Sequence, residues 1–71
     1  MELINRQKIA GLSLSEACIQ QERLNSRLAV TDSKLRKVRS ERREQLLRED
    51  KQNLEELYMA LSEHIEELII S

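Results

Sequence analysis

The sequence predicts an all-α protein, built as one long, nearly straight α-helix behind a short amino-terminal arm, without an independent globular core. Three observations support this. The 71 residues contain no proline and only one glycine, Gly11. Charged residues make up 35% of the chain, against about 25% in ordinary domains, which favours long charged helices over a layered fold. Tyr58 is the only aromatic residue, so leucine and isoleucine must supply the packing, and we expect such a short chain to need a partner.

Residues 1–12 are expected to form the arm, either a helical turn or an extended segment that ends at Gly11. The following SLSE has the form of a capping box. In this motif the Ser13 hydroxyl accepts from the Glu16 amide, and the Glu16 carboxylate accepts from the Ser13 amide. A first helical segment over 13–30 should therefore begin near Ser13.

The stretch AVTDS at 29–33 is the one candidate break. Its valine and threonine are β-branched and weaken a helix, while Asp32 or Ser33 is suited to cap a second one. No glycine or proline enforces a turn here. A helical hairpin bent near 31–33 is therefore the alternative to the single helix.

The long helix is expected over 33–70, where leucine, glutamate, lysine, arginine and glutamine dominate. Oppositely charged residues four positions apart add support in the favourable acid-first order. Glu44 with Arg48, and Asp32 with Arg36, are two such pairs.

Five leucines recur at intervals of eleven residues, at positions 24, 35, 46, 57 and 68. Eleven residues make three turns at about 3.67 residues per turn, close to an undistorted α-helix. This ladder stays in phase across 29–33, which favours the single helix, whereas a heptad repeat would place Arg42 and Gln45 at core positions. We interpret the ladder and its apolar neighbours as a partner-binding stripe. For the ladder, the alternative is a chance spacing in a leucine-rich sequence. For the apolar run that begins at Leu54, the alternative is core packing inside a hairpin. The stripe consists of Leu24, Leu28, Leu35, Val38, Leu46, Leu47, Leu54, Leu57, Tyr58, Leu61, Ile65 and Leu68.

The formal net charge is only −1, but the charges are segregated, with a basic block at 34–43 and no lysine or arginine after Lys51. We expect the block to contact an acidic protein surface, with a solvated helix face as the alternative. Nucleic acid is not expected, because acidic residues flank the block and no aromatic is interleaved for stacking. A membrane is not expected either, because the opposite face has only Leu35 and Val38. The basic block consists of Lys34, Arg36, Lys37, Arg39, Arg42 and Arg43.

No arrangement of residues suggests catalysis or a cofactor. His64 and Cys18 are the only histidine and cysteine and lie far apart in the chain. The glutamates near His64 are interpreted as a solvated acidic face rather than a metal site. The lone thiol and the lack of a long apolar run predict an intracellular protein, soluble or bound to the cytoskeleton. The lack of a catalytic arrangement predicts that it is not an enzyme.

The stretch that begins at Arg39 resembles the carboxy-terminal helix of cilia- and flagella-associated protein 141 and similar very small microtubule inner proteins of ciliary doublets. That pattern has an arginine and a glutamate, a double leucine, an acidic residue, an aromatic, a Glu-Leu pair and a glycine. Leu54 and Leu61 stand here where the aromatic and the glycine are expected. The residues that fit the pattern are Arg39, Glu41, Leu46, Leu47, Asp50, Glu56 and Leu57.

The resemblance implies a structural, non-catalytic protein on the luminal wall of axonemal doublet microtubules. Its partners would be tubulin and neighbouring inner proteins, and its location the cytoplasm, within the cytoskeleton of the cilium or flagellum. The alternative function is a helical adaptor or an oligomerising subunit of a larger intracellular complex.

Overall fold

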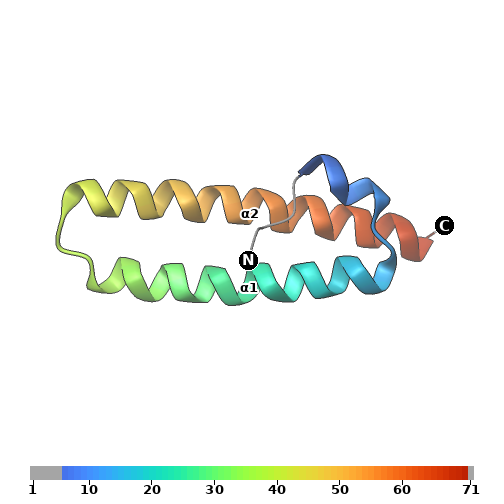
Figure 1. Ribbon diagram of the computed structural model, residues 1–71, viewed down its shortest axis with the longest axis horizontal. Coiled ribbons are helices and arrows are strands. Elements are labelled where there is room, and N and C mark those ends of the chain that lie inside the picture. Colours follow the sequence, from blue (N-terminus) through green and yellow to red (C-terminus); the bar gives the residue numbers. More distant parts are fainter. Residues whose placement is uncertain (1–5, 71) are drawn as a thin grey trace.

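The protein forms a two-helix hairpin in the computed structural model, which describes residues 6–70 (Figure 1). A short 3₁₀ helix, η1 (Arg6–Gly11), precedes α1 (Leu14–Lys37) and α2 (Glu41–Ile70). The two long helices run antiparallel side by side, and η1 folds back onto α2 near the carboxyl end of the chain. The molecule measures 46 × 22 × 18 Å. The all-α prediction is therefore confirmed, and the hairpin alternative replaces the single long helix, which was wrong.

The chain turns at 38–40 and not at the expected 31–33. Asp32 and Ser33 lie inside α1 and cap nothing. Thr31 is tolerated there because its Oγ1 donates to the Arg27 carbonyl oxygen at 2.9 Å, which satisfies the buried hydroxyl within the helix. The β-branched pair therefore does not end the helix.

The turn is made without glycine. Val38 ends α1 by adopting an extended conformation, with φ −71° and ψ 139°. Ser40 then starts α2, because its carbonyl oxygen accepts from the Glu44 amide at 2.9 Å and its hydroxyl accepts from the Arg43 amide at 3.5 Å. A serine before a helical run is an N-cap signal that the sequence already carried.

The capping box at the start of α1 is confirmed. The Ser13 amide donates to Glu16 Oε1 at 3.3 Å, and the Glu16 amide donates to Ser13 Oγ at 3.2 Å. Of the expected arm over 1–12, residues 6–11 form η1, and residues 1–5 lie outside the described part of the chain.

The buried side chains lie along the contact between the helices and follow a heptad. In α1, positions 17, 21, 24, 28, 31 and 35 are buried or half-buried, and in α2 so are positions 44, 47, 51, 54, 58, 61 and 65. Alternating steps of three and four residues define the seam of a coiled coil. The most buried side chains are Ile9, Ala17, Leu24, Thr31, Leu54 and Leu61.

A heptad fits the sequence poorly as one continuous repeat, because the repeat restarts after the turn. Continued beyond Val38, the α1 repeat places Arg42 and Gln45 in the seam, yet both side chains are exposed. The α2 repeat begins instead at Glu44 and Leu47, two positions later. The turn thus resets the phase.

The eleven-residue ladder does not form one face of the molecule, so that interpretation was wrong. Leu24 is fully buried, whereas Leu46 is 58% exposed and Leu68 is 36% exposed. The ladder crosses the turn between Leu35 and Leu46, and a spacing along the chain keeps its phase only while the helix is continuous.

Truncation of Leu54 tests whether the seam holds the hairpin together. Leu54 is fully buried, so Leu54→Ala should lower the free energy of unfolding by about 2–5 kcal/mol. The matched control Leu46→Ala, at a position 58% exposed, should change it by no more than about 0.5 kcal/mol. Urea denaturation followed by circular dichroism measures both, and equal effects would contradict the assigned core.

Candidate partner-binding site at the hairpin turn

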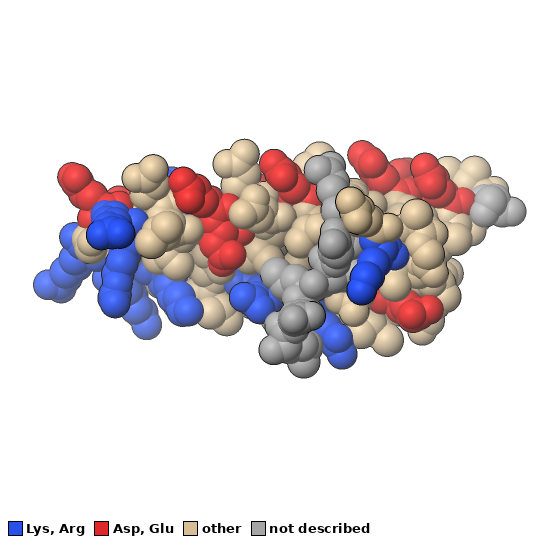
Figure 2. Space-filling view, turned by 45° about the horizontal axis from the view of Figure 1, so that its top comes forward, with Lys and Arg blue, Asp and Glu red and all other residues tan. Residues whose placement is uncertain are grey.

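The turn gathers the basic block at one end of the molecule. Three of its cations come from the last turn of α1, Arg39 comes from the loop, and the remaining two come from the first turn of α2. All six side chains are exposed, and Figure 2 shows lysine and arginine concentrated at the turn end. The structure therefore places the cations around a tip rather than along one helix face.

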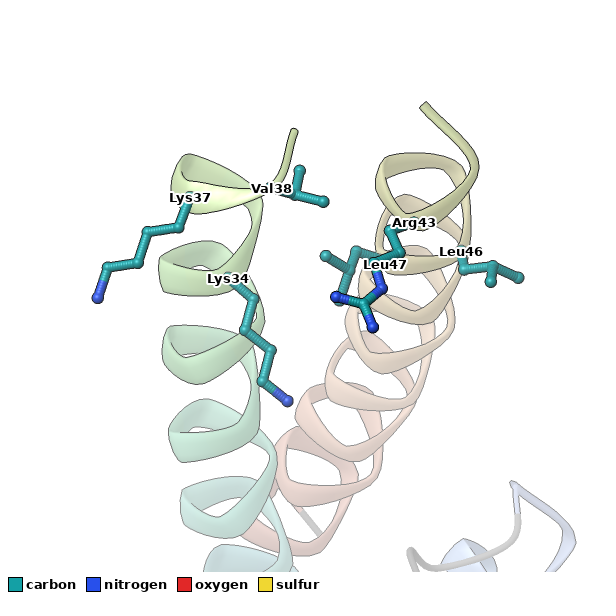
Figure 3. Close-up of a pocket in the computed structure, with 6 residues that line it drawn as sticks. All are labelled: Lys34, Lys37, Val38, Arg43, Leu46 and Leu47. Carbon is teal, nitrogen blue, oxygen red and sulfur yellow. The ribbon is translucent and has the colours of Figure 1, made fainter. Parts of the chain in front are cut away.

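A cavity of about 590 Å³ opens between the end of α1 and the start of α2. In Figure 3, Val38 and Leu47 point toward one another across the gap between the helices. The charged ends of Lys34 and Arg43 lie over the same gap. The remaining lining residues, Lys37 and Leu46, flank the cavity and point outward on its two sides (Figure 3).

A second cavity of about 350 Å³ continues along the same side of the seam. It shares Lys34 and Leu47 with the first, so the two cavities adjoin. We refer to them together as the seam groove. The second cavity is lined by Ser26, Arg27, Val30, Thr31, Lys34, Leu47 and Asp50.

Near the turn, the seam between the helices is not fully packed, because its side chains there are polar or only partly covered. Glu44, Leu47 and Lys51 occupy the α2 seam positions nearest the turn, and all three are half-buried. Farther from the turn, Leu54 and Leu61 are completely buried. The two helices therefore pack tightly away from the turn and leave a groove near the turn.

Two polar contacts between the helices fix their register. Gln21 Nε2 donates to Ser62 Oγ at 2.7 Å, and Lys51 Nζ lies 2.7 Å from Asp32 Oδ1. Gln21 and Asp32 are eleven residues apart on α1, and Lys51 and Ser62 are eleven residues apart on α2. Both contacts thus belong to one antiparallel register.

Asp32 forms an ion pair with Lys51 across the two helices. Its hydrogen bond to Lys51, and then its charge, raise the pKa of Lys51. Asp32 pairs with Lys51 on the other helix rather than with Arg36, so that expected pair was wrong. The other expected pair, Glu44 with Arg48, is confirmed at 2.9 Å.

Most of the predicted apolar stripe packs within the hairpin. Leu24, Leu54 and Leu61 have no exposed surface and form the core. For Leu54 and Leu61 the core alternative is therefore confirmed. Partner binding stays a prediction for the members that keep exposed surface. Leu46 and Leu68 are exposed, and the half-buried members are Leu28, Leu35, Val38, Leu47, Leu57, Tyr58 and Ile65.

His64 holds the amino-terminal segment on α2. Its Nε2 lies 2.9 Å from the Leu12 carbonyl oxygen, and because a carbonyl only accepts, Nε2 must carry the proton. Ile9 of η1 is 5% exposed and belongs to the core cluster, and it lines a cavity together with Ala60 and His64. His64 is half-buried and has a structural role, because it joins the segment before α1 to α2. Nothing in the sequence around His64 indicated this contact.

The remaining residues considered for chemistry do not form a site in the described part of the chain. Cys18 is exposed with a free thiol. Within residues 6–70 no three histidine, cysteine or acidic side chains are grouped so as to hold a metal ion. No helix of this part of the chain is long and apolar enough to cross a membrane.

Comparison with known proteins yields no relative: no family model, no curated protein and no solved structure matches this chain.

Sequence reasoning missed the seam groove. Arg27 and Val30 line it from α1, and Asp50 lines it from α2. The three residues come together only because the chain folds back on itself. The serine before α2 was the one local signal of that turn.

The pair of Asp32 and Lys51 should make stability sensitive to alkaline pH. A pKa raised by folding contributes stability below the unfolded pKa, about 10.4 for lysine, and this contribution is lost as pH rises through the folded pKa. Asp32→Asn should remove this part of the alkaline loss. Urea denaturation across the alkaline range measures it, with the exposed Asp50→Asn as the control. Identical pH profiles for wild type and Asp32→Asn would contradict the pairing.

Removing the ring donor of His64 should loosen η1. His64→Phe keeps an aromatic ring but leaves the Leu12 carbonyl without its donor, a loss of about 1 kcal/mol. Tryptic cleavage after the exposed Lys8 should then become about fivefold faster. His64→Gln retains an N–H donor and should restore part of the protection. Unchanged cleavage in His64→Phe would show that the contact does not hold the segment.

Proposed function

We propose that this protein is a structural, non-catalytic microtubule inner protein that binds along the luminal wall of axonemal doublet microtubules. Its contacts would be with tubulin and with neighbouring inner proteins. The observation that carries the proposal is the concentration of six exposed cations at one end of a 46 Å helical hairpin. The resemblance of the segment from Arg39 onward supplies the identity of the scaffold.

The cationic tip supports binding to an acidic protein surface. Residues 34–43 contain six cations and one acidic residue, Glu41. Because these side chains lie around a convex turn, several of them can meet the same surface at once. Such a concentrated charge steers association with an acidic scaffold and makes it sensitive to salt.

The segment that carries the resemblance includes both the tip and part of the core. It begins in the turn at Arg39 and continues along α2 to Leu57. Leu54, which stands where the pattern has an aromatic, is completely buried against α1. Leu46 of the double leucine is 58% exposed. On this helix the buried face maintains the hairpin, and the exposed face is available to a scaffold.

A helical adaptor or oligomerising subunit is the second candidate, and the carboxyl end of α2 favours it. Leu68, Ile69 and Ile70 are 36%, 67% and 79% exposed, and an apolar patch of this kind commonly marks a protein contact. Sedimentation velocity over a range of concentrations separates the candidates. A defined oligomer in solution would favour the adaptor, and a monomer would favour dependence on a scaffold.

Localisation of the tagged full chain in ciliated cells tests the first proposal. We expect the protein to remain on axonemes after detergent extraction. Arg39→Ala with Arg42→Ala should reduce retention about three- to tenfold, and more strongly as salt increases, because surface charge contacts are screened. Neither residue lines the seam groove.

The control variant removes the same charge away from the turn, by Lys8→Ala with Arg23→Ala, and should be retained like wild type. A diffuse cytosolic or nuclear signal for the unmodified chain would reject the axonemal proposal. Equal losses in the two double variants would reject the tip as the contact.

A further inference from the structure

We infer that the seam groove is a docking site for an acidic, amphipathic α-helix of a partner protein. The inference goes beyond the proposed function, because it concerns one surface and does not depend on where the protein resides. It follows from the apolar floor of the groove, the charge of its rim and its length.

The floor of the groove is apolar and accessible. Val38 and Leu47 are half-buried across the gap between the helices. Val30 lines the second cavity and Leu46 flanks the first, and these side chains, 54% and 58% exposed, add apolar surface on α1 and α2 beside the floor. An apolar strip left open by the fold gains stability when an apolar side chain covers it.

The rim of the groove is strongly cationic. Arg27, Lys34, Lys37 and Arg43 line it, whereas Asp50 is the only carboxylate that does. The ion pairs of the described residues are Arg48 with Glu44 and Lys51 with Asp32, so none of the four rim cations is used in them. The charge of the rim is thus complementary to an acidic occupant, and the alkyl stems of the lysines add apolar surface.

The shape of the groove suits a helix. Its lining residues on α1 recur every three or four positions from Ser26 to Lys37, a length of about 17 Å at 1.5 Å per residue. About three turns of a third helix would fill it and complete a three-helix bundle. The groove is lined by helices whose backbone groups are already paired, so the occupant must satisfy its own backbone, as a helix does.

The occupant should carry apolar side chains at i, i+3 or i+4, and i+7, with aspartate or glutamate on either side of this stripe. The acidic carboxyl half of α2 from a second copy does not meet this requirement. Its apolar side chains Leu54, Tyr58 and Leu61 already pack in the core of its own hairpin. A separate partner protein is therefore the inferred source of the helix.

Fluorescence anisotropy with the purified full chain tests the inference. The probe is a labelled synthetic peptide of about 18 residues, with leucine at the stated spacing and glutamate and alanine elsewhere. The peptide should bind saturably and gain helix by circular dichroism. A peptide of the same composition with its leucines scrambled should bind at least about tenfold more weakly, because it cannot place them along one groove.

A charge-matched pair of variants locates the binding. Val30→Glu with Leu46→Glu alters two exposed groove positions and should weaken peptide binding at least about tenfold. Ile19→Glu with Met59→Glu adds the same charge at positions that are 46% and 64% exposed and outside the groove, and should bind like wild type. Circular dichroism must show wild-type helix content for both variants.

Three results would overturn the inference. The first is equal binding of the ordered and scrambled peptides, or of polyglutamate and duplex DNA at the same salt concentration, which would indicate nonspecific attraction of anions. The second is unchanged peptide binding by the groove variant. The third is a dimer in sedimentation equilibrium that Val30→Glu with Leu46→Glu abolishes, which would assign the groove to a second copy. Peptide binding without axonemal retention would reject the proposed function alone.

Discussion

The burial of three leucines between α1 and α2 is the interaction on which the rest of the structure depends. Leu24, Leu54 and Leu61 are the largest side chains with no exposed surface, in a chain whose only aromatic residue is half-buried. A single amphipathic helix leaves its apolar stripe in water, and folding back provides a second stripe to cover it. The hairpin is therefore the means by which this short chain buries apolar surface at all.

Apolar contact alone does not specify how two helices align, and the polar contacts of the seam supply this alignment. Gln21 with Ser62, and Asp32 with Lys51, are satisfied together in one antiparallel register. Sliding α2 along α1 would leave these polar groups without partners, at a cost in free energy. Near the turn, where the seam contains Glu44 and Lys51, a polar contact between the helices, that of Lys51 with Asp32, takes the place of buried apolar side chains.

This division of the seam separates stability from recognition. The fully buried leucines lie away from the turn. There η1 adds the side chain of Ile9 and the contact of His64 with Leu12. The turn end carries the exposed cations and the seam groove. A partner bound at the turn would also stabilise the hairpin, because it binds only the folded chain. The tip can thus be highly charged without weakening the core.

The sequence by itself determined the helical class, the capping box at Ser13, the pair of Glu44 with Arg48 and the basic block, because each depends on residues close in the chain. It favoured one continuous helix and placed the alternative break at 31–33, where the Thr31 hydroxyl in fact donates to a carbonyl oxygen of its own helix. Only the tertiary structure decided that the chain turns at 38–40, which leucines form the core and that cations from both helices surround one groove. These features depend on contacts between distant residues, such as Gln21 with Ser62, and no local spacing encodes which helix face the second helix will cover.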